Sequence, residues 1–435
     1  MPPRDSFCCG IDYGTSNSTV ALADAAGIRV LEADPSSEVA PSLIYLHREG
    51  RRLAGADAER TFFTTGHERT ACLECSLAPY GISECRQYRR GGGCNDARLL
   101  WAVKRDLAKP SFSGTNSWAA DFPPADLVSV VIGHLRARAE AEAGAELGRA
   151  VVGHPVRFPD AVGDAGAHEV ALERLTDAAR RAGFDEVELL PEPTAAALAG
   201  AAEHDGVAVT LDFGGGTFDV AVTDFDRPGD PVRGLAAAPV GGERLDEVLF
   251  EIAVAEPLGL HDLPNWIFDE LRSLNKVMLA LADPGLPRIL DRVGGRGAAN
   301  AAAILYGGRA YDFYKAIEAA KVRLSSEPAT RIRFRHDALR LDVPVTRQAF
   351  ETAIKPELDL VEVAIREALD AAESRPSEVR TVLLTGGSSQ LPAFRARVAE
   401  VFPVSTIEHR ADAFTTVVRG LALHAQRRWG PVKVG

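Results

Sequence analysis

The chain has 435 residues, of which 46% are hydrophobic and 25% are charged, and its formal net charge is −12. The length exceeds that of one ordinary domain, and the composition is typical of a folded globular protein rather than of a disordered chain. The negative charge leaves no overall basic surface for a nucleic-acid backbone or an anionic membrane, so we expect neither as a partner.

Two further sequence properties bear on the cellular compartment. No apolar run approaches the roughly 20 residues that span a bilayer, and residues 1–7 lack the apolar region of a signal peptide. Six cysteines in a chain of this length, without a secretory signal, indicate reduced thiols rather than a disulfide framework. We therefore predict a cytoplasmic protein.

Two segments far apart in the chain share one pattern of residues. In residues 10–20 and again in residues 211–220, an apolar run is followed by an aspartate, a glycine-containing turn and a second β-prone run. Each segment is predicted to be a β-hairpin. The repetition indicates an internal duplication of the fold.

The other predicted elements alternate between helices and strands. Between the two hairpins we predict helices at 127–145, at 170–182 and from Thr194 onwards, with strands at 150–155 and 187–190. After the second hairpin come predicted helices at 311–324, 391–401 and 417–428, a strand at 379–384 and a turn at 386–388. This alternation indicates the α/β class.

We expect two duplicated α/β lobes with a ligand-binding cleft between them. The first lobe is assigned to residues 1–203 and the second to 204–411, and a C-terminal helix within 412–435 is expected to return to the first lobe. An inserted cysteine- and glycine-rich subdomain is expected at about 39–123, and a helical subdomain at about 244–345.

The turns of the two hairpins have the chemistry of phosphate-binding loops. In a glycine-rich turn, consecutive backbone N–H groups converge on one point without obstruction by side chains, and nearby hydroxyls add further donors. Aspartates at the strand ends are suited to hold a hydrated Mg²⁺ beside phosphate oxygens. The chain contains no G-x-x-x-x-G-K-[ST] loop, and neither hairpin fits the G-x-G-x-x-G pattern, so another type of phosphate clamp is indicated.

Four motifs of the chain resemble those of one protein family. They are Asp-x-Gly-Thr-x-Asn-Ser at 12–18, Glu-Pro-Thr-Ala-Ala-Ala at 192–197, Asp-x-Gly-Gly-Gly-Thr-Phe-Asp at 212–219 and Gly-Gly-Glu-x-x-Asp at 241–246. In this order they are similar to motifs of the seventy-kilodalton heat-shock chaperones, the DnaK-like Hsp70 family, and in detail to its short bacterial YegD-type members. The resemblance implies the nucleotide-binding domain of that family, with an actin-like ATPase fold and slow, Mg-dependent hydrolysis of ATP in the cleft.

The resemblance also implies roles for individual residues. The phosphates of ATP or ADP would contact both turns, at Gly14, Thr15, Ser16, Gly214, Gly215, Gly216 and Thr217. The metal would lie near the carboxylates of Asp12, Asp212 and Asp219. Catalysis would depend on Lys104, which positions the attacking water, on Glu192 beside that water, and on Thr217 and Asp219.

The implied nucleoside site departs from the family pattern at two positions. Its expected members are Gly241, Gly242, Glu318, Lys321, Ser325, Gly386, Gly387 and Ser388. Val322 and Gln390 stand where the family usually holds adenine between two arginines, so we expect a weakened affinity or an altered base preference. Arg323 points about 100° around the helix from residue 322, so it is not a direct substitute.

Three alternative functions share the predicted fold. A nucleotide-gated binding module would bind ATP with little turnover, and the altered adenine positions favour it over the other two. A small-molecule kinase would need an acceptor pocket with a catalytic aspartate, and an actin-like filament protein would assemble in the presence of ATP. After the last predicted helix we find no leucine-rich linker and no β-rich segment, so we expect no peptide-binding domain. The sequence does not identify a protein client or a co-chaperone.

Four cysteines lie close together in a glycine-rich stretch before Lys104. They are Cys72, Cys75, Cys85 and Cys94. Four thiolates are able to hold a tetrahedral Zn²⁺, but only one pair has the C-x-x-C spacing that is typical of a zinc site. Unliganded thiols are therefore favoured over zinc.

Overall fold

A computed structural model describes most of the chain. The described residues are 7–64, 97–117, 120–158, 161, 165–200, 205–227, 231–280, 285–307, 309–337, 339–409 and 415–430. All structural statements below concern these residues.

The first sheet contains the first of the two predicted hairpins. Its strands lie in the order β11-β10-β1-β2-β3, with β4 beside β2. Strands β1, β2 and β3 are antiparallel, whereas β10 runs parallel to β1 and β11 runs parallel to β10. The strands are β1 Cys8–Tyr13, β2 Asn17–Asp24, β3 Gly27–Val30, β4 Ala40–Pro41, β10 Arg149–His154 and β11 Glu186–Pro191.

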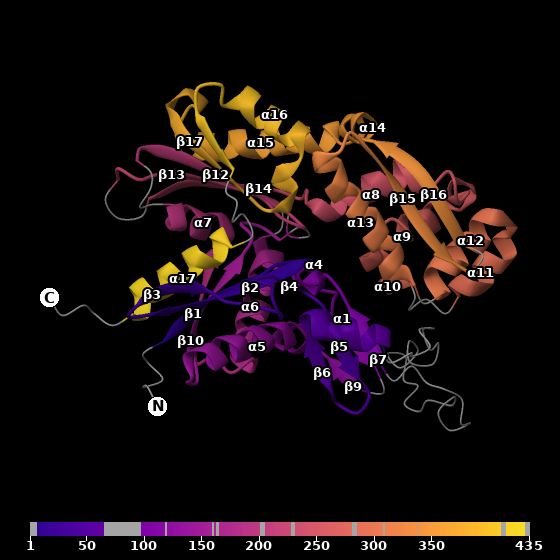
Figure 1. Cartoon of the computed structure of the whole chain (residues 1–435), viewed down its shortest axis with the longest axis horizontal. Helices are drawn as coiled ribbons and strands as arrows, with labels where there is room; N and C mark the ends of the chain where they lie inside the picture. The colour runs from indigo at the N-terminus through magenta and orange to yellow at the C-terminus, as the bar shows by residue number, and fades with distance from the viewer. Residues whose placement is uncertain are drawn as a thin grey trace.

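The second sheet repeats the topology of the first. Its order is β14-β13-β12-β17-β18, with β12, β13 and β14 antiparallel, β17 parallel to β12 and β18 parallel to β17. The strands are β12 Val207–Phe213, β13 Phe218–Asp224, β14 Val232–Ala238, β17 Val379–Thr385 and β18 Thr406–His409. The predicted duplication is therefore confirmed, and Figure 1 shows the two sheets in separate halves of the molecule.

Helices cover both faces of the first sheet. Helices α5 (Pro124–Ala143) and α6 (Ala165–Arg181) share one hydrophobic cluster with the β1 residues Cys9 and Ile11. Helix α5 has proline in its first turn and ends at Gly144, whose φ of 64° is left-handed. Its buried residues recur at helical spacing, as the sequence predicted.

The opposite face of the first sheet is covered by α7 (Glu192–Gly200) and α17 (Thr416–Trp429). Helix α7 also contacts β12 and β13 and so lies between the two sheets. Helices α15 (Lys355–Ala371) and α16 (Pro392–Val401) contribute buried side chains to the core of the second sheet. No helix in the described part of the chain is long and apolar enough to cross a membrane.

Two peripheral parts extend beyond the sheets on the same side of the molecule (Figure 1). The first comprises β5 Ile44–His47, β6 Arg52–Ala54, α1 Gly55–Thr64, β7 Ala97–Leu100, α4 Val103–Asp106, β8 Thr115–Ser117 and β9 Ala120–Phe122. The second begins with α8 Gly242–Leu249, α9 Asn265–Glu270, α10 Leu274–Ala280, α11 Leu286–Val293, α12 Gly295–Tyr306 and α13 Ala310–Ser326. It continues with the hairpin β15 Ala329–His336 and β16 Leu339–Thr346, and with α14 Arg347–Ala353.

The second peripheral part is more mixed than the helical subdomain that we expected. The sequence analysis did not predict the β15–β16 hairpin, although its buried residues alternate with exposed ones along both strands. The glycine-rich stretch 294–297 begins helix α12. The hairpin packs its apolar face on α13, and Phe334 contacts Phe313 there.

Helices α7 and α17 cross each other at short range. A Cβ atom placed on Gly420 would lie 1.7 Å from the carbonyl oxygen of Ala195, so any side chain at this position requires the two backbones to separate. Since both helices contact the first sheet and α7 also contacts the second, this crossing fixes the junction between the lobes.

We expect Gly420→Ala to destabilise the protein by about 1–3 kcal/mol, because the added methyl group overpacks the crossing. The matched control is Gly133→Ala in α5, where the added Cβ meets its nearest neighbour at an ordinary 4.0 Å. That change should be neutral or stabilise by up to about 1 kcal/mol through helix propensity. Urea unfolding of both variants measures the difference, and equal effects would contradict the close crossing.

Candidate active site

The turns of the two hairpins face each other across a cavity. In the first turn, a Cβ on Gly14 would lie 2.1 Å from the carbonyl oxygen of Asn17, which explains why this position requires glycine. In the second turn, a Cβ on Gly215 would lie 2.9 Å from the Ser16 hydroxyl. The second turn therefore comes close to the first at Gly215, where a side chain would obstruct the space between the two turns.

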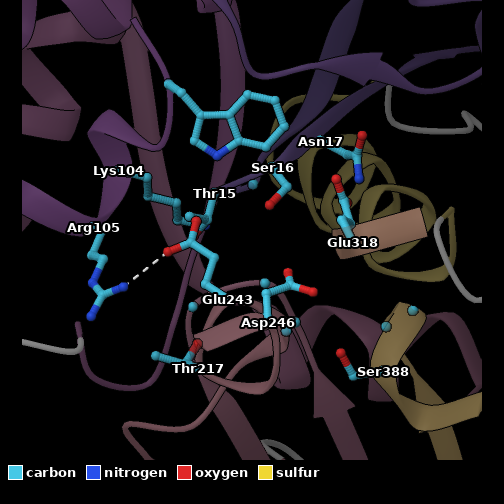
Figure 2. Close-up of a pocket in the computed structure, with 18 of the residues that line it drawn as sticks. Thr15, Ser16, Asn17, Lys104, Arg105, Thr217, Glu243, Asp246, Glu318 and Ser388 are labelled. Carbon is cyan, nitrogen blue, oxygen red and sulfur yellow. Dashed lines mark hydrogen bonds and ion pairs between the residues drawn. The ribbon is translucent and has the colours of Figure 1, made fainter. Parts of the chain in front are cut away.

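The cavity has a volume of about 350 Å³ and is lined from both halves of the chain. Predicted site residues that line it are Asp12, Gly14, Thr15, Ser16, Lys104, Glu192, Asp212, Gly214, Gly215, Gly216, Thr217, Gly242, Glu318, Lys321, Ser325, Gly386, Gly387 and Ser388. Gly241 packs behind the second turn, against the backbone of Gly215 and Gly216. Figure 2 shows Thr15 and Ser16 on one side of the cavity, with Asp246 and Ser388 on the other.

A buried ion pair lies at the wall of this cavity. The ammonium of Lys104 donates to Oε1 of Glu192 over 2.5 Å, and the two residues are only 4% and 8% exposed. Lys104 is the second residue of the short helix α4, which begins directly after Ala102. The φ of Ala102 is 55°, in the left-handed region that alanine seldom adopts. The backbone strain at Ala102 is thus located where the chain turns to place Lys104.

Carboxylates outnumber cations around this pair. Burial, with the charge of Glu192 next in importance, raises the pKa of Asp12 to about 8 and that of Asp212 to about 7. The same causes raise the pKa of Asp219 well above its usual range. Burial alone would lower the pKa of Lys104, but the negative charges of Glu192 and Asp12 raise it. The cluster therefore contains fewer cationic groups than carboxyl groups.

This donor set fits a hydrated divalent cation. No three histidine, cysteine, aspartate or glutamate side chains of the described residues converge into a cage that would enclose an ion by itself. Mg²⁺ usually binds through one or two carboxylates, waters and substrate phosphates, so it does not require such a cage. Asp12 and Asp212 would hold the ion from the cavity wall.

Asp219, which we expected near the metal and in catalysis, accepts two hydrogen bonds in the structure. Its two carboxylate oxygens accept hydrogen bonds from the Thr217 hydroxyl, at 2.6 Å, and from the backbone N–H of Val156, at 2.7 Å. Val156 follows β10 of the first sheet, whereas Asp219 belongs to β13 of the second. Asp219 therefore joins the two halves of the molecule in addition to supporting the second turn.

A second polar contact across the cleft was not predicted from the sequence. Nη1 of Arg105 donates to Oε2 of Glu243 over 3.0 Å, and Figure 2 shows this ion pair beside Lys104 and Thr217. Glu243 is the third residue of the Gly-Gly-Glu-x-x-Asp motif, and Arg105 directly follows the predicted site residue Lys104. The sequence gives no indication that the two residues meet, which only the structure shows.

Two of the predicted nucleoside residues on α13 have partners within the protein. Lys321 donates to the carbonyl oxygen of Gly242 and to Asp246, both at 2.8 Å, and Glu318 accepts from Lys315. Val322 is 61% exposed at the cavity edge. Arg323 donates instead to the Thr330 hydroxyl on β15, so it does not replace the missing adenine arginine.

An aromatic contact also joins the two peripheral parts over the cavity. The rings of Trp101 and Tyr311 lie 5.5 Å apart, and the ammonium of Lys315 lies 4.5 Å from the centre of the Trp101 ring. The Tyr311 hydroxyl donates to Glu59 of α1 over 3.0 Å. No motif in the sequence indicated this group, which we call the aromatic clasp: Glu59, Trp101, Tyr311 and Lys315.

The cysteine cluster that was considered as a zinc site lies outside the described residues. Within them, Cys8 and Cys9 are unpaired, buried thiols of β1. Burial raises the pKa of Cys8 to about 11, which makes this thiol unreactive at neutral pH.

The family model described as Hsp70 protein matches residues 8–259 and 310–434. The chain belongs to the Hsp70 family. The actin-like ATPase fold expected for the family agrees with the duplicated sheets around one cleft.

Hsp70 chaperones are also among the curated relatives of this chain. The chain is 23% identical over 439 residues to "Chaperone protein DnaK" of Thermosipho melanesiensis, an alignment that covers 98% of this chain and 60% of that protein. It is 26% identical over 430 residues to "Chaperone protein HscA homolog" of Burkholderia mallei, covering 98% and 59%, and the homolog from Burkholderia pseudomallei gives the same figures. The chain thus spans about 60% of the length of these relatives.

The Hsp70 match leaves out residues 260–309. This segment contains α9 to α12, and its residues Arg272, Ser273, Leu274 and Asn275 line the cavity. One wall of the cavity therefore comes from a part of the chain to which the family match does not extend.

We expect the stability of the metal-free protein to fall as pH rises from about 4 to about 8, because Asp12 ionises near pH 4 when unfolded but only near pH 8 when folded. In Asp12→Asn this contribution is absent, so its melting temperature should fall less over the same range.

Thermal melting between pH 5 and 8 without Mg²⁺ measures this effect. The control is Asp342→Asn, since that exposed carboxyl has a pKa lowered by Arg331 and is ionised throughout the range. A pH dependence of Asp12→Asn identical to that of the wild type would contradict the buried, protonated Asp12.

Proposed function

We propose that this chain binds Mg·ATP between its two hairpin turns and hydrolyses it slowly. The observation that carries the proposal is the cavity into which both duplicated turns open, with the buried Lys104–Glu192 pair in its wall. Phosphoryl transfer depends mainly on positioning and charge stabilisation, and this cavity offers backbone donors, a lysine and a carboxylate cluster for both.

Different groups of the cavity have different roles in hydrolysis. The backbone N–H groups of both turns bind phosphate oxygens, and Mg²⁺ supplies neutralising charge when it is bound. Lys104, held by Glu192, orients a water molecule toward the terminal phosphorus. As the water oxygen bonds to phosphorus, the bond to the leaving diphosphate oxygen breaks, and a carboxylate of the cluster takes the proton.

The same contacts couple the nucleotide to the arrangement of the lobes. Phosphates that bind both turns favour the closed cleft, in which Arg105 pairs with Glu243 and Asp219 accepts from Val156. Release of the phosphates removes this preference and allows the lobes to separate around α7 and α17.

A role as a chaperone ATPase of the Hsp70 type extends this proposal. It is supported by family membership and by the DnaK and HscA relatives, which are named as chaperones. Within the family, the motifs described above favour the bacterial YegD-type members. A phylogeny built on the residues of the cleft would test that placement.

We expect Lys104→Ala and Thr217→Ala each to lower Mg-dependent ATP turnover on the order of a hundredfold, because each removes a group that positions the reacting atoms. Phosphate release by purified protein measures the rate, and circular dichroism shows whether each variant is folded. The control is Lys355→Ala, an exposed lysine of α15 outside the cavity. Unchanged turnover in both cavity variants would refute the assignment of the site.

Trp101→Ala should speed the release of bound ADP about fivefold to thirtyfold, because the aromatic and cation–π contacts of the clasp hold the cleft closed. Stopped-flow measurement with a fluorescent ADP analogue gives the release rate. Trp266→Ala, at a 47% exposed residue of α9, is the matched control. A release rate equal in both variants would show that the clasp does not retain the nucleotide.

A second candidate function is a nucleotide-gated binding module with little turnover. It is favoured by Val322 and Gln390 at the cavity edge, since neither side chain provides the flat cation that stacks on a base. Binding by calorimetry and phosphate release, measured on one preparation, distinguish the two functions. Saturable binding of ATP without phosphate release would support the module.

A further inference from the structure

A groove on the outer surface of the second peripheral part is lined by arginines. It lies between α13 and the β15–β16 hairpin and has a volume of about 730 Å³. Its lining residues are Ala316, Ala319, Arg323, Ala329, Thr330, Arg331, Arg333 and Pro344, and we call it the arginine groove. None of these residues lines the cavity of the candidate active site.

The positive charge continues along the outer face of the hairpin. Arg331, Arg333 and Arg335 alternate with the inward-facing Ile332 and Phe334 along β15, and all three arginines are exposed. Arg340 on β16 lies directly opposite Arg335. Asp342 is the acidic residue of this face, and it pairs with Arg331 at 2.6 Å and with Arg333 at 3.4 Å. The face therefore has a clear excess of positive charge in a chain whose net charge is −12.

This arrangement is unfavourable for the hairpin by itself. Like charges that face each other across an antiparallel pair are destabilising, and Arg335 and Arg340 form such a pair. Neither arginine is needed for packing, since the hairpin buries the opposite face through Ile332, Leu341 and Val345. An anionic partner would neutralise the repulsion.

The spacing and the backbone of β15 favour an extended peptide as that partner. Arginines two residues apart on a strand repeat about every 6.8 Å, which equals the repeat of alternate side chains in a second extended chain. The N–H of Arg347 donates to the carbonyl oxygen of Pro328, so these two residues form a hydrogen-bonded pair of the antiparallel ladder. Hydrogen-bonded and non-hydrogen-bonded pairs alternate along such a ladder, so the backbone N–H and C=O groups of Arg331 and Arg333 point away from β16. The carbonyl oxygen of Arg331 indeed accepts from Arg323 on the groove side.

The floor of the groove also suits a peptide backbone. Ala316, Ala319 and Ala329 leave room for a main chain to lie close to the protein, while the arginine side chains stand beside it. A nucleic acid fits less well, because its unbroken row of phosphates would meet Asp342 between the arginines and the negative charge of the rest of the chain.

From these observations we propose that the arginine groove binds an extended, acidic segment of a partner protein. Alternate carboxylates of the segment pair with Arg331, Arg333 and Arg335, and guanidinium groups are suited to bind carboxylates through two parallel hydrogen bonds. Arg331 and Arg333 exchange their contact with Asp342 for these carboxylates. The groove and the cavity share no lining residue, although helix α13 contributes to both.

Fluorescence anisotropy with defined probes tests the proposal on the whole chain. The main probe is a fluorescein-labelled peptide of about ten residues in which glutamate alternates with serine, to match the two-residue repeat. The comparison probes are a peptide of the same composition with its glutamates in one block, and a labelled oligothymidylate of about ten nucleotides.

We expect saturable binding of the alternating peptide, weaker binding of the block peptide, and loss of affinity as salt rises. Arg331→Glu combined with Arg333→Glu should weaken binding at least about tenfold, because two attractions become repulsions. Arg366→Glu combined with Arg380→Glu reverses two exposed charges elsewhere and should have little effect. Arg335→Ala combined with Arg340→Ala provides a second, milder test, with an expected loss of about threefold.

Three results would overturn the proposal. These are no saturable binding of the alternating peptide by the wild type, an equal loss in the groove and control variants, and tighter binding of oligothymidylate that is lost in the groove variant. Circular dichroism and ATP binding confirm that each variant is folded, since the altered side chains are exposed and lie away from the cavity.

Discussion

The gathering of four carboxylates around one lysine is the constraint on which the rest of the cleft depends. Asp12, Asp212, Asp219 and Glu192 come from both halves of the chain, and Lys104 is the cation buried among them. Such a cluster is stable only if the surrounding structure holds it together and if protonation or further positive charge reduces the repulsion between its carboxylates. The duplicated sheets supply the first condition, and a bound cation beside the two backbone turns would supply the second.

The sequence predicted those parts of the site that are encoded locally. The turns after Asp12 and Asp212 were predictable because glycine spacing and hydroxyl residues determine their backbone shape within a few residues. The Arg105–Glu243 pair and the Trp101–Tyr311 contact were not, since each joins residues more than a hundred positions apart. Glu243 belonged to a predicted motif, but nothing in the motif specifies its partner. The β15–β16 hairpin was missed although its arginines alternate with apolar residues at a spacing typical of a strand.

Residues outside the Hsp70 match also border the cavity. Helices α9 to α12 lie within residues 260–309, and the segment 272–275 borders the same cavity as the two hairpin turns. Leu274 packs both on the core of the second lobe and on the cluster around Tyr45 and Tyr311. Residues inside and outside the Hsp70 match thus line one cavity, so a ligand bound there would contact both.

The position of α17 has a consequence for how the chain acquires its structure. This helix follows the whole second lobe in the sequence, yet it covers the face of the first sheet that contains Cys8, Ala21 and Val151. During synthesis, that face stays uncovered by α17 until residues 416–429 have left the ribosome. The first lobe therefore cannot complete its folding until the second lobe has been synthesised, so part of its apolar sheet face stays exposed in the nascent chain during that time.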